Sequence, residues 1–344
     1  MDLPMQPSGA SSTSSSTETK VSELSKTSGL TRNAPMLGIS LKVGSTMVFA
    51  IMIVSLKMTS ETVPIGEIVF ARNFFGMWPV LLMVMARGEL MEAFRTTNIA
   101  GHLGRSMVGI TAMVFSFTAF ALLPLPDATA IGFATPLIVV VLAWAVLGET
   151  VRIYRWSAVL IGFGGIIVIL SPHLGQGALE GKEAVGALCG ALAACFAAMA
   201  MIFVRKLCES EKTSTIVTWF SGCATVLALL TLPIGWIWPS QAWIMPEAPI
   251  AWLLVLVGLA GGVGQILLTQ SYRFADASTI APFDYTNMIW AILLGWFLFS
   301  EIPVLEVVLG AGIVIAAGIF VIYREHRLGL DRTKNRRAST PSRV

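Results

Sequence analysis

The chain has 344 residues, of which 55% are hydrophobic and only 12% are charged, and its formal net charge is +3. Soluble domains carry about 25% charged residues, so this composition excludes an ordinary soluble protein. One bilayer crossing needs roughly 20 apolar residues, and the chain holds enough apolar sequence for many crossings. We therefore expect an all-α membrane protein embedded in a lipid bilayer.

The two ends of the chain differ from its apolar middle. Residues 1–35 are rich in Ser and Thr, as in "SGASSTSSSTETK", so we expect a disordered, solvated tail. They hold no apolar core followed by a small-residue cleavage site, which argues against a secretory signal peptide. Residues 324–344 are basic and are expected to form a mobile tail.

Apolar runs between Pro, Gly and charged breaks predict ten membrane-spanning helices. In chain order the expected spans are 37–56, 64–86, 99–123, 127–147, 154–170, 184–204, 214–236, 249–272, 279–299 and 303–323.

The basic residues of the loops predict the orientation of these spans. With both chain ends in the cytoplasm, the opposite loops hold only Lys57 and Lys182. Basic residues concentrate on the cytoplasmic side of membrane proteins, so both tails are expected there. The cytoplasmic loops then carry Arg87, Arg95, Arg152, Arg155, Arg205, Lys206, Lys212 and Arg273.

The two halves of the chain resemble each other. "LPDATAIGFATPLIVVVLAWAVLGE" in the first half parallels "FADASTIAPFDYTNMIWAILLGWFLFSE" in the second, and both end on a glutamate, Glu149 or Glu301. Each half holds five helices, an odd number, so the second half enters the membrane from the opposite side. We expect two inverted five-helix repeats, residues 36–171 and 184–323, with a substrate site between them near the midplane.

Sequence motifs give no support for a cofactor, metal or nucleic-acid site. The glycine runs "GFGG" and "GAG" lie inside expected helices, where they favour close helix packing rather than nucleotide binding. No P-loop is present, the three histidines are scattered, and the four cysteines lack CxxC spacing. We expect neither an enzyme nor direct use of ATP.

Three stretches form a recognisable pattern together with the Gly-rich last helix of each half: "PIGEIVFARNFFG" (64–76), "ATPLIVVVLAWAVLGE" (134–149) and "APFDYTNMIWAILLGWFLFSE" (281–301). This pattern resembles the drug/metabolite transporter superfamily, specifically its EamA-type ten-helix carriers. Two substitutions depart from the repeated pattern, Met288 for a proline and Ser300 for a glycine. The subgroup looks like alphaproteobacterial proteins described as riboflavin or S-adenosylmethionine importers. This resemblance implies secondary transport by alternating access in the bacterial inner membrane.

Arg72 is the sharpest candidate for a functional residue. It lies eight residues into the expected second helix, about 12 Å deep at 1.5 Å per residue, beside Asn73 and one turn from Glu67. An intramembrane arginine either faces a cavity and binds an anionic or carbonyl group, or stays paired with a buried acid. Glu67 is shallower and either belongs to the site or extends outward to the interface.

Asp284 is the second candidate, because a carboxylate inside an apolar span is costly unless it is paired or faces water. Asn287 shares its helix face, and Tyr285 and Trp290 add aromatic surface nearby. In the functional hypothesis Asp284 is a gate, a proton acceptor or a partner of Arg105. In the structural alternative the helix dipole, Arg273 or Thr286 stabilises it.

Further candidates come from the third and fourth helices. Arg105 is either a gate residue or an anchor at the lipid headgroups. Phe133, Thr135 and Pro136 are the first-half counterparts of the Asp284 region, and Pro136 is expected to kink or open its helix. Gln265 and Gln270 are expected to hydrogen-bond between helices rather than to contact cargo.

These observations favour a secondary carrier of a small polar metabolite, and the subgroup resemblance implies riboflavin uptake as the first hypothesis. S-adenosylmethionine uptake and export of amino acids, metabolites or drugs are the alternatives. A coupling proton or ion and a homodimer are compatible with this hypothesis. A membrane enzyme or a scaffold protein fits less well, because packing alone requires neither intramembrane charges nor an inverted repeat.

Overall fold

The computed structural model describes residues 34–88, 90–148, 151–174, 181–207, 210–211, 213–275 and 277–338. All regular elements in these ranges are helices, which confirms the expected all-α class. Almost all of the expected N-terminal tail, and Glu149 of the repeat, lie outside the described residues.

Among the described residues, nine stretches are long and apolar enough to cross a bilayer. One further apolar stretch is divided into three short elements, α13, η2 and α14. It comes ninth in chain order, and we call it the ninth span. In chain order the elements are α2 (Pro35–Thr59), α3 (Ile65–Ala86), α4 (Leu90–Ala93), α5 (Ile99–Leu122), α6 (Leu125–Gly132), α7 (Ala134–Leu147), α8 (Ile153–Leu174), α9 (Lys182–Leu207), α10 (Thr213–Leu229), α11 (Ile234–Ile237), η1 (Pro239–Gln241), α12 (Ala248–Phe274), α13 (Ala277–Ile280), η2 (Ala281–Tyr285), α14 (Thr286–Phe299) and α15 (Leu305–Ala338).

The fourth and ninth spans are both broken. The fourth breaks at Phe133, between α6 and α7, just after Gly132 and three residues before Pro136, as the expected kink requires. The ninth was predicted as one helix over 279–299, and this prediction is wrong. A 3₁₀ segment, η2, interrupts it where Pro282 lacks the N–H that a continuous helix would use.

Matching turns end these two spans. α7 ends on Gly148 with φ 66°, and α14 ends on Ser300 with φ 56°, both in the left-handed region. After α14 the Ser300 N–H donates to Trp296 O (3.1 Å) and the Glu301 N–H donates to Gly295 O (3.0 Å). The bond from Ser300 to Trp296 is that of an αL motif, in which a left-handed residue after the helix satisfies one of its last carbonyls.

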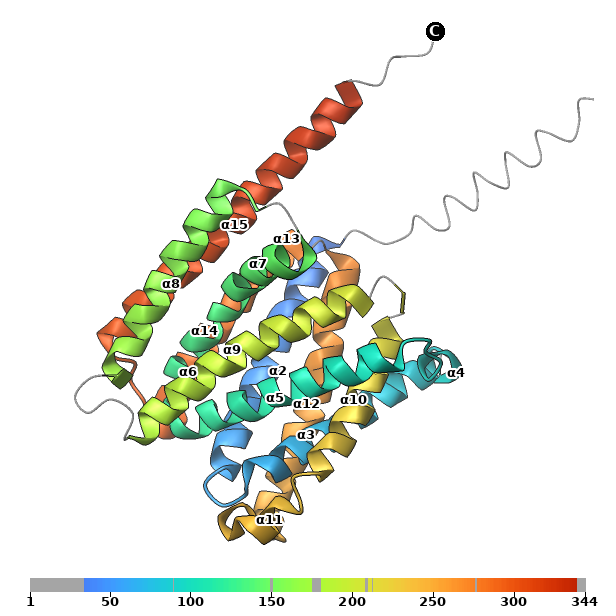
Figure 1. Ribbon diagram of the computed structural model, residues 1–344, viewed down its shortest axis with the longest axis vertical. Coiled ribbons are helices and arrows are strands. Elements are labelled where there is room, and N and C mark those ends of the chain that lie inside the picture. Colours follow the sequence, from blue (N-terminus) through green and yellow to red (C-terminus); the bar gives the residue numbers. More distant parts are fainter. Residues whose placement is uncertain are drawn as a thin grey trace, which may run out of the picture.

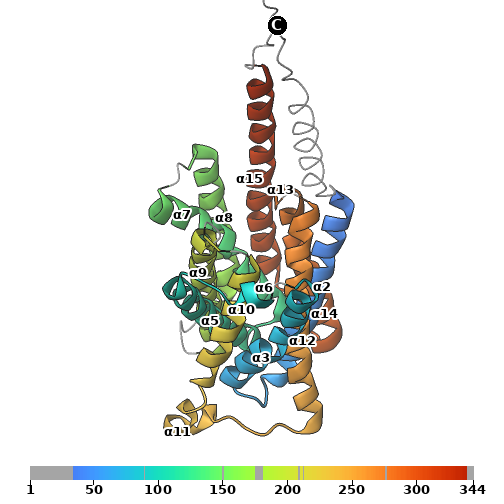
Figure 2. The same ribbon diagram turned by 90° about the vertical axis from the view of Figure 1, so that its right-hand side faces the viewer.

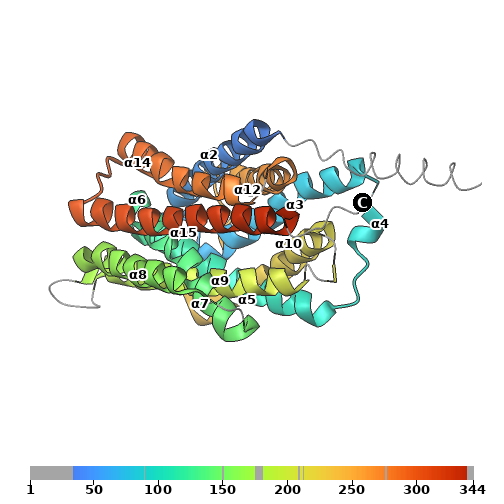
Figure 3. The same cartoon turned by 90° about the horizontal axis from the view of Figure 1, so that it is seen from above.

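The helices pair in a pattern that an inverted repeat requires. α2 packs against α12 in the same way that α9, its counterpart, packs against α5, and α3 with α12 mirrors α10 with α5. The counterparts α8 and α15 pack against each other, side by side in Figures 1 and 3. The contacts of α12 with α2 and α3 therefore recur as those of α5 with α9 and α10, with the roles of the halves exchanged.

Glycines allow two of these helix pairs to approach closely, as the sequence predicts. A Cβ on Gly310 of α15 would lie 2.6 Å from Gly165 O of α8, and a Cβ on Gly76 of α3 would lie 3.0 Å from Gly258 O of α12. Any larger side chain at these positions would push the helices apart.

The two ends of the bundle have different characters. We call the end where α2 begins and α15 ends the tail face, and the opposite end, which carries α11, the loop face (Figure 2). α15 continues as a helix to Ala338 and projects beyond the other helices. The basic segment from residue 324 therefore begins as a continuation of α15.

Candidate functional site

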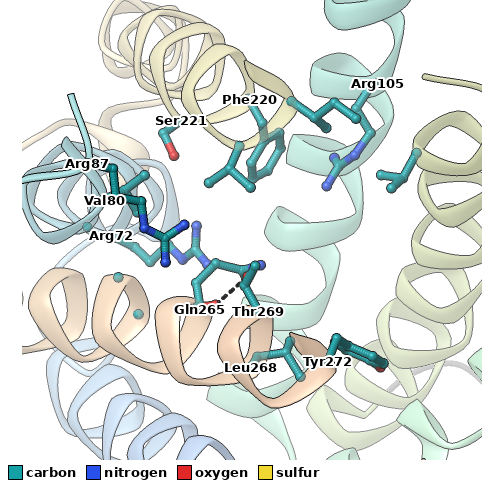
Figure 4. A pocket seen from close by; sticks show the side chains of 16 residues that line it. Arg72, Val80, Arg87, Arg105, Phe220, Ser221, Gln265, Leu268, Thr269 and Tyr272 are labelled. Atoms are coloured by element: carbon teal, nitrogen blue, oxygen red, sulfur yellow. Dashed lines mark hydrogen bonds between the residues drawn. The ribbon is translucent and has the colours of Figure 1, made fainter. Parts of the chain in front are cut away.

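A cavity of about 580 Å³ lies among α3, α5, α9, α10 and α12. Its volume falls within the roughly 300–1,000 Å³ that is usual for small-molecule sites. Figure 4 shows side chains entering it from several helices. The polar and aromatic residues of its lining are Arg72, Arg87, Arg105, Phe220, Ser221, Gln265, Thr269 and Tyr272.

The cavity extends from the middle of the bundle toward the tail face. Arg72 and Gly261 line its inner part, in the middle of α3 and α12, whereas Arg87 and Tyr272 lie where those helices reach the tail face. The lining residues include none from the loop-face ends of these helices. A solute in this cavity would be reached from the tail face.

Arg72 is held at the inner part of the cavity by its neighbour in sequence. Its Nη1 donates to Asn73 Oδ1 (3.1 Å), and Asn73 Nδ2 donates in turn to Val69 O (2.8 Å). Gly261 leaves room for the side chain, because a Cβ there would lie 3.2 Å from Arg72 Nε. That Nε is buried and has no hydrogen-bond partner.

Arg105 enters from α5, across the cavity from α3 (Figure 4). Its guanidinium carbon lies 4.1 Å from the ring centre of Phe220, a cation–π contact. Gly109, one turn further along α5, leaves space for this arginine. The Arg105 Nε is also buried without a hydrogen-bond partner.

The lining carries three arginines and no acidic residue. Within the described part of the chain, no ion pair joins Arg72, Arg87 or Arg105 to a carboxylate within 4.0 Å. The cavity is therefore strongly cationic.

Asp284 pairs with Lys42 of α2 rather than with Arg105 or Thr286, which corrects the partners expected from the sequence. Their Nζ and Oδ1 atoms lie 2.5 Å apart, and the Lys42 side chain is buried (2% exposed) whereas that of Asp284 is half exposed (48%). Lys42 Nζ also lies 5.8 Å from the ring centre of Tyr272. The pair thus borders the tail-face part of the cavity. The side chain of Arg273 is outside the described residues.

A small polar cluster continues from this pair toward the middle of the bundle. Thr46 and Thr286 share a hydrogen bond of 2.9 Å, and Trp290 Nε1 donates to Thr46 Oγ1 (3.1 Å). These contacts join α2 to the ninth span. Trp290 therefore contacts α2 and is not part of the cavity lining.

The remaining sequence candidates lie outside the cavity lining. Phe133 and Tyr285, which are equivalent in the two repeats, pack edge to face at 5.2 Å. Glu67 is buried near the loop face and accepts from the Ile244 N–H (3.1 Å). Thr135 and Pro136 lie in the first turn of α7, and Asn287 lies in the first turn of α14.

A second ion pair lies at the loop face. Lys57 Nζ donates to Glu301 Oε1 and to Leu123 O (2.7 Å), and Glu301 Oε2 accepts from the Leu125 N–H (2.8 Å). We call these four residues the Lys57 latch. It ties the end of α2 and the end of the ninth span to the turn between α5 and α6.

Glu211 connects two loops on the tail face, outside the spans. Its Oε1 accepts from Thr96 Oγ1 (2.6 Å) and from the Thr97 N–H (3.2 Å). The bond from Thr96 in particular holds the pKa of this carboxyl below its usual range. His102 Nε2 lies 4.0 Å away.

Several residues of this region were missed from the sequence. Lys42 lies well inside the first apolar span, so the rule that singled out Arg72 also applies to it. Gln265 lines the cavity, although it was expected to bond between helices. Phe220 and Ser221 carried no signal in the sequence, because such residues are common in membrane helices. Among the described residues, no group of His, Cys, Asp or Glu could hold a metal ion.

Comparisons with known proteins identify the family. The model of the EamA-like transporter family matches residues 36–171 and 184–324. An S-adenosylmethionine uptake transporter of Rickettsia prowazekii (strain Madrid E) is 30% identical over 264 residues, which cover 76% of this chain and 84% of the relative. The pseudopaline exporter CntI of Pseudomonas aeruginosa (strain UCBPP-PA14) is 27% identical over 299 residues, which cover 86% and 96%.

The fold is shared with a solved structure. A crystal structure that is 16% identical in sequence superposes with a TM-score of 0.60 and covers 86% of this chain and 98% of its own. At this identity the likeness concerns the fold alone. Together with the family match, it shows that this chain belongs to the EamA-like transporter family of multi-pass membrane proteins.

Proposed function

We propose that the chain is a secondary transporter that moves a small polar metabolite across the bacterial inner membrane by alternating access, with both chain ends in the cytoplasm. The observation that carries this proposal is the cavity, which reaches the tail face and has no lining residue from the loop-face ends of its helices. At the loop face the Lys57 latch joins α2 and the ninth span to the turn between α5 and α6. This geometry is expected of a carrier whose binding cavity is open to one side of the membrane and closed to the other. In the proposed orientation it is the inward-facing state.

S-adenosylmethionine uptake is the first cargo hypothesis. A relative that is 30% identical is named for this uptake. The pseudopaline exporter, at 27%, is named for transport in the other direction, so direction is the less supported part of the proposal. Riboflavin, which the sequence motifs favoured, has no support from these named relatives.

Counterflow into proteoliposomes tests this function. Vesicles preloaded with unlabelled S-adenosylmethionine should take up the labelled compound transiently above its equilibrium level, without ATP. Arg72→Gln should abolish this overshoot, whereas Arg95→Gln, an exposed arginine outside the cavity, should preserve it.

Riboflavin is measured in parallel with the same vesicles. An overshoot with riboflavin alone would restore the hypothesis from the sequence. The absence of both overshoots, with folded protein in sealed vesicles, would reject both cargoes.

A further inference from the structure

We infer that the cavity selects organic acids, and that solutes with two acid groups bind it more tightly than solutes with one. This inference rests on the proposed function, since it names the class of cargo that the same cavity takes.

Three acidic residues of the bundle bind partners other than the cavity's arginines. Asp284 pairs with Lys42, and Glu301 pairs with Lys57 at the opposite face. Glu67 accepts from a backbone N–H near the loop face. These three carboxylates are therefore bound in contacts that do not involve the cavity's arginines.

The arginines themselves are only partly satisfied. Arg72 donates to Asn73, a neutral amide, and Arg105 faces the ring of Phe220. Each also has a buried Nε without a hydrogen-bond partner. Guanidinium groups present a planar fork of donors that matches a carboxylate in two parallel hydrogen bonds. A carboxylate between Arg72 and Arg105 would supply the charge and the acceptors that the protein does not.

One carboxylate still leaves the cavity with an excess of positive charge. Arg72 and Arg105 are partly buried in a region of low dielectric, where like charges repel one another strongly, and the exposed Arg87 adds a third positive charge at the rim. A second acid group on the same solute reduces this excess. A solute with a net positive charge increases it. S-adenosylmethionine carries one carboxylate, one ammonium and one sulfonium, so it is expected to bind more weakly than a diacid and to be displaced by it.

The rest of the lining suits a short organic chain between the acid groups. Phe220 supplies an apolar surface, and Ser221, Gln265 and Thr269 supply neutral polar groups. Thr269 is already bonded to Gln265 O (2.8 Å), which fixes its hydroxyl on the α12 wall (Figure 4). Simple inorganic anions would leave this surface without contacts, so they are expected to bind more weakly.

Three solutes with one carbon skeleton test the inference on protein in lipid nanodiscs. Glutarate, glutaramate and glutaramide carry two, one and no acid groups. Isothermal titration should give affinities in that order, with about tenfold between steps, since a hydrogen bond between charged groups is worth roughly one such factor. Arg72→Gln and Arg105→Gln should each weaken glutarate at least about tenfold and leave glutaramide unchanged.

Two variants control for folding and for general charge. Arg95→Gln removes an exposed arginine outside the cavity and should leave all affinities unchanged. Arg72→Lys keeps the charge without the fork, so it should bind glutarate more tightly than Arg72→Gln does. Each variant is first checked for an unchanged melting temperature.

Specific outcomes overturn the inference. Equal affinities for the three solutes, or no binding of any of them, would reject recognition by acid groups. Sulfate binding as tight as glutarate binding would show a site for anions in general. Glutarate binding without S-adenosylmethionine flux would reject the cargo hypothesis and keep this inference. Flux that glutarate does not inhibit would keep the transporter and reject the inference.

Discussion

The lysines of α2 and the arginines of the cavity differ in how their charges are compensated. The two lysines of α2 are each paired, one with Asp284 and one with Glu301, and such pairs fix the positions of the helices that carry them. Arg72 and Arg105 line the cavity and face neutral partners. Breaking a buried pair leaves an uncompensated charge, so the paired residues hold the structure while the cavity's arginines are available to a solute.

Arg87 offers a test of how the cavity attracts a solute. It is exposed at the tail-face rim, so it interacts with a solute mainly through water. Arg87→Gln should weaken glutarate binding only about two- to fivefold in 50 mM salt, as expected of an exposed charge. In 500 mM salt the effect should vanish, because the Debye length falls below about 5 Å. Titrations at the two salt concentrations measure this.

A salt-independent loss for Arg87→Gln would contradict this assignment. It would mean that Arg87 contacts the solute directly inside the cavity. Arg95→Gln, which is also exposed, serves as the control at both salt concentrations.

The sequence predicted which residues were unusual better than it predicted their partners. Arg72 and Asp284 stood out because charges are rare within apolar spans. The partner of Asp284 is 242 positions away in sequence, on a helix whose neighbours no local pattern reveals. Arg105 was assigned to either a gate or a lipid anchor, and only the packing of α5 against α10 places it beside Phe220.

At the scale of single elements, the repeat explains both a correct and a wrong prediction. The break in the fourth span follows from Gly132 and Pro136, which are visible in the sequence. The ninth span has Met288 where the repeat has Pro136, so it was predicted to be continuous. Pro282, six residues earlier, breaks it instead. A broken span is thus retained in both halves through prolines at different positions.

The turn at Ser300 predicts a stabilising substitution. Its left-handed conformation costs a residue with a Cβ about 1–2 kcal/mol, and the additional backbone entropy of glycine offsets roughly 0.5–1 kcal/mol of the gain. Ser300→Gly should therefore raise the free energy of unfolding by about 0.5–1 kcal/mol. Gly148→Ala, at the equivalent turn, should lower it. Unfolding by denaturing detergent measures both, and a loss of stability in Ser300→Gly would refute the argument.

At the scale of the molecule, the number and order of the spans followed from composition, because each crossing needs a long apolar run. Which helices touch did not follow from it. α2 is attached to the ninth span near both of its ends, through Lys42 at the tail face and Lys57 at the loop face. Both pairs are formed at the same time. α2 and the ninth span are therefore expected to move together, and the loop face is expected to open where the latch meets the turn between α5 and α6.

The Lys57 latch gives a direct test of alternating access. Glu301→Gln removes the charge that Lys57 contacts and weakens the tie to the Leu125 N–H, so the loop face should open more often. With the native cysteines replaced, a Ser221→Cys reporter in the cavity should then react about tenfold faster with a membrane-impermeant maleimide applied from the loop face. Glu247→Gln, an exposed loop-face acid outside the latch, is the matched control.

Sealed vesicles with the loop face outside provide this measurement. Glutarate should slow the labelling in both variants if it occupies the cavity beside the reporter. Equal labelling of Glu301→Gln and Glu247→Gln would mean that the latch does not control opening. The contacts that close the loop face would then be the apolar ones around Leu123, and the ion pair would serve only to join α2 to the ninth span.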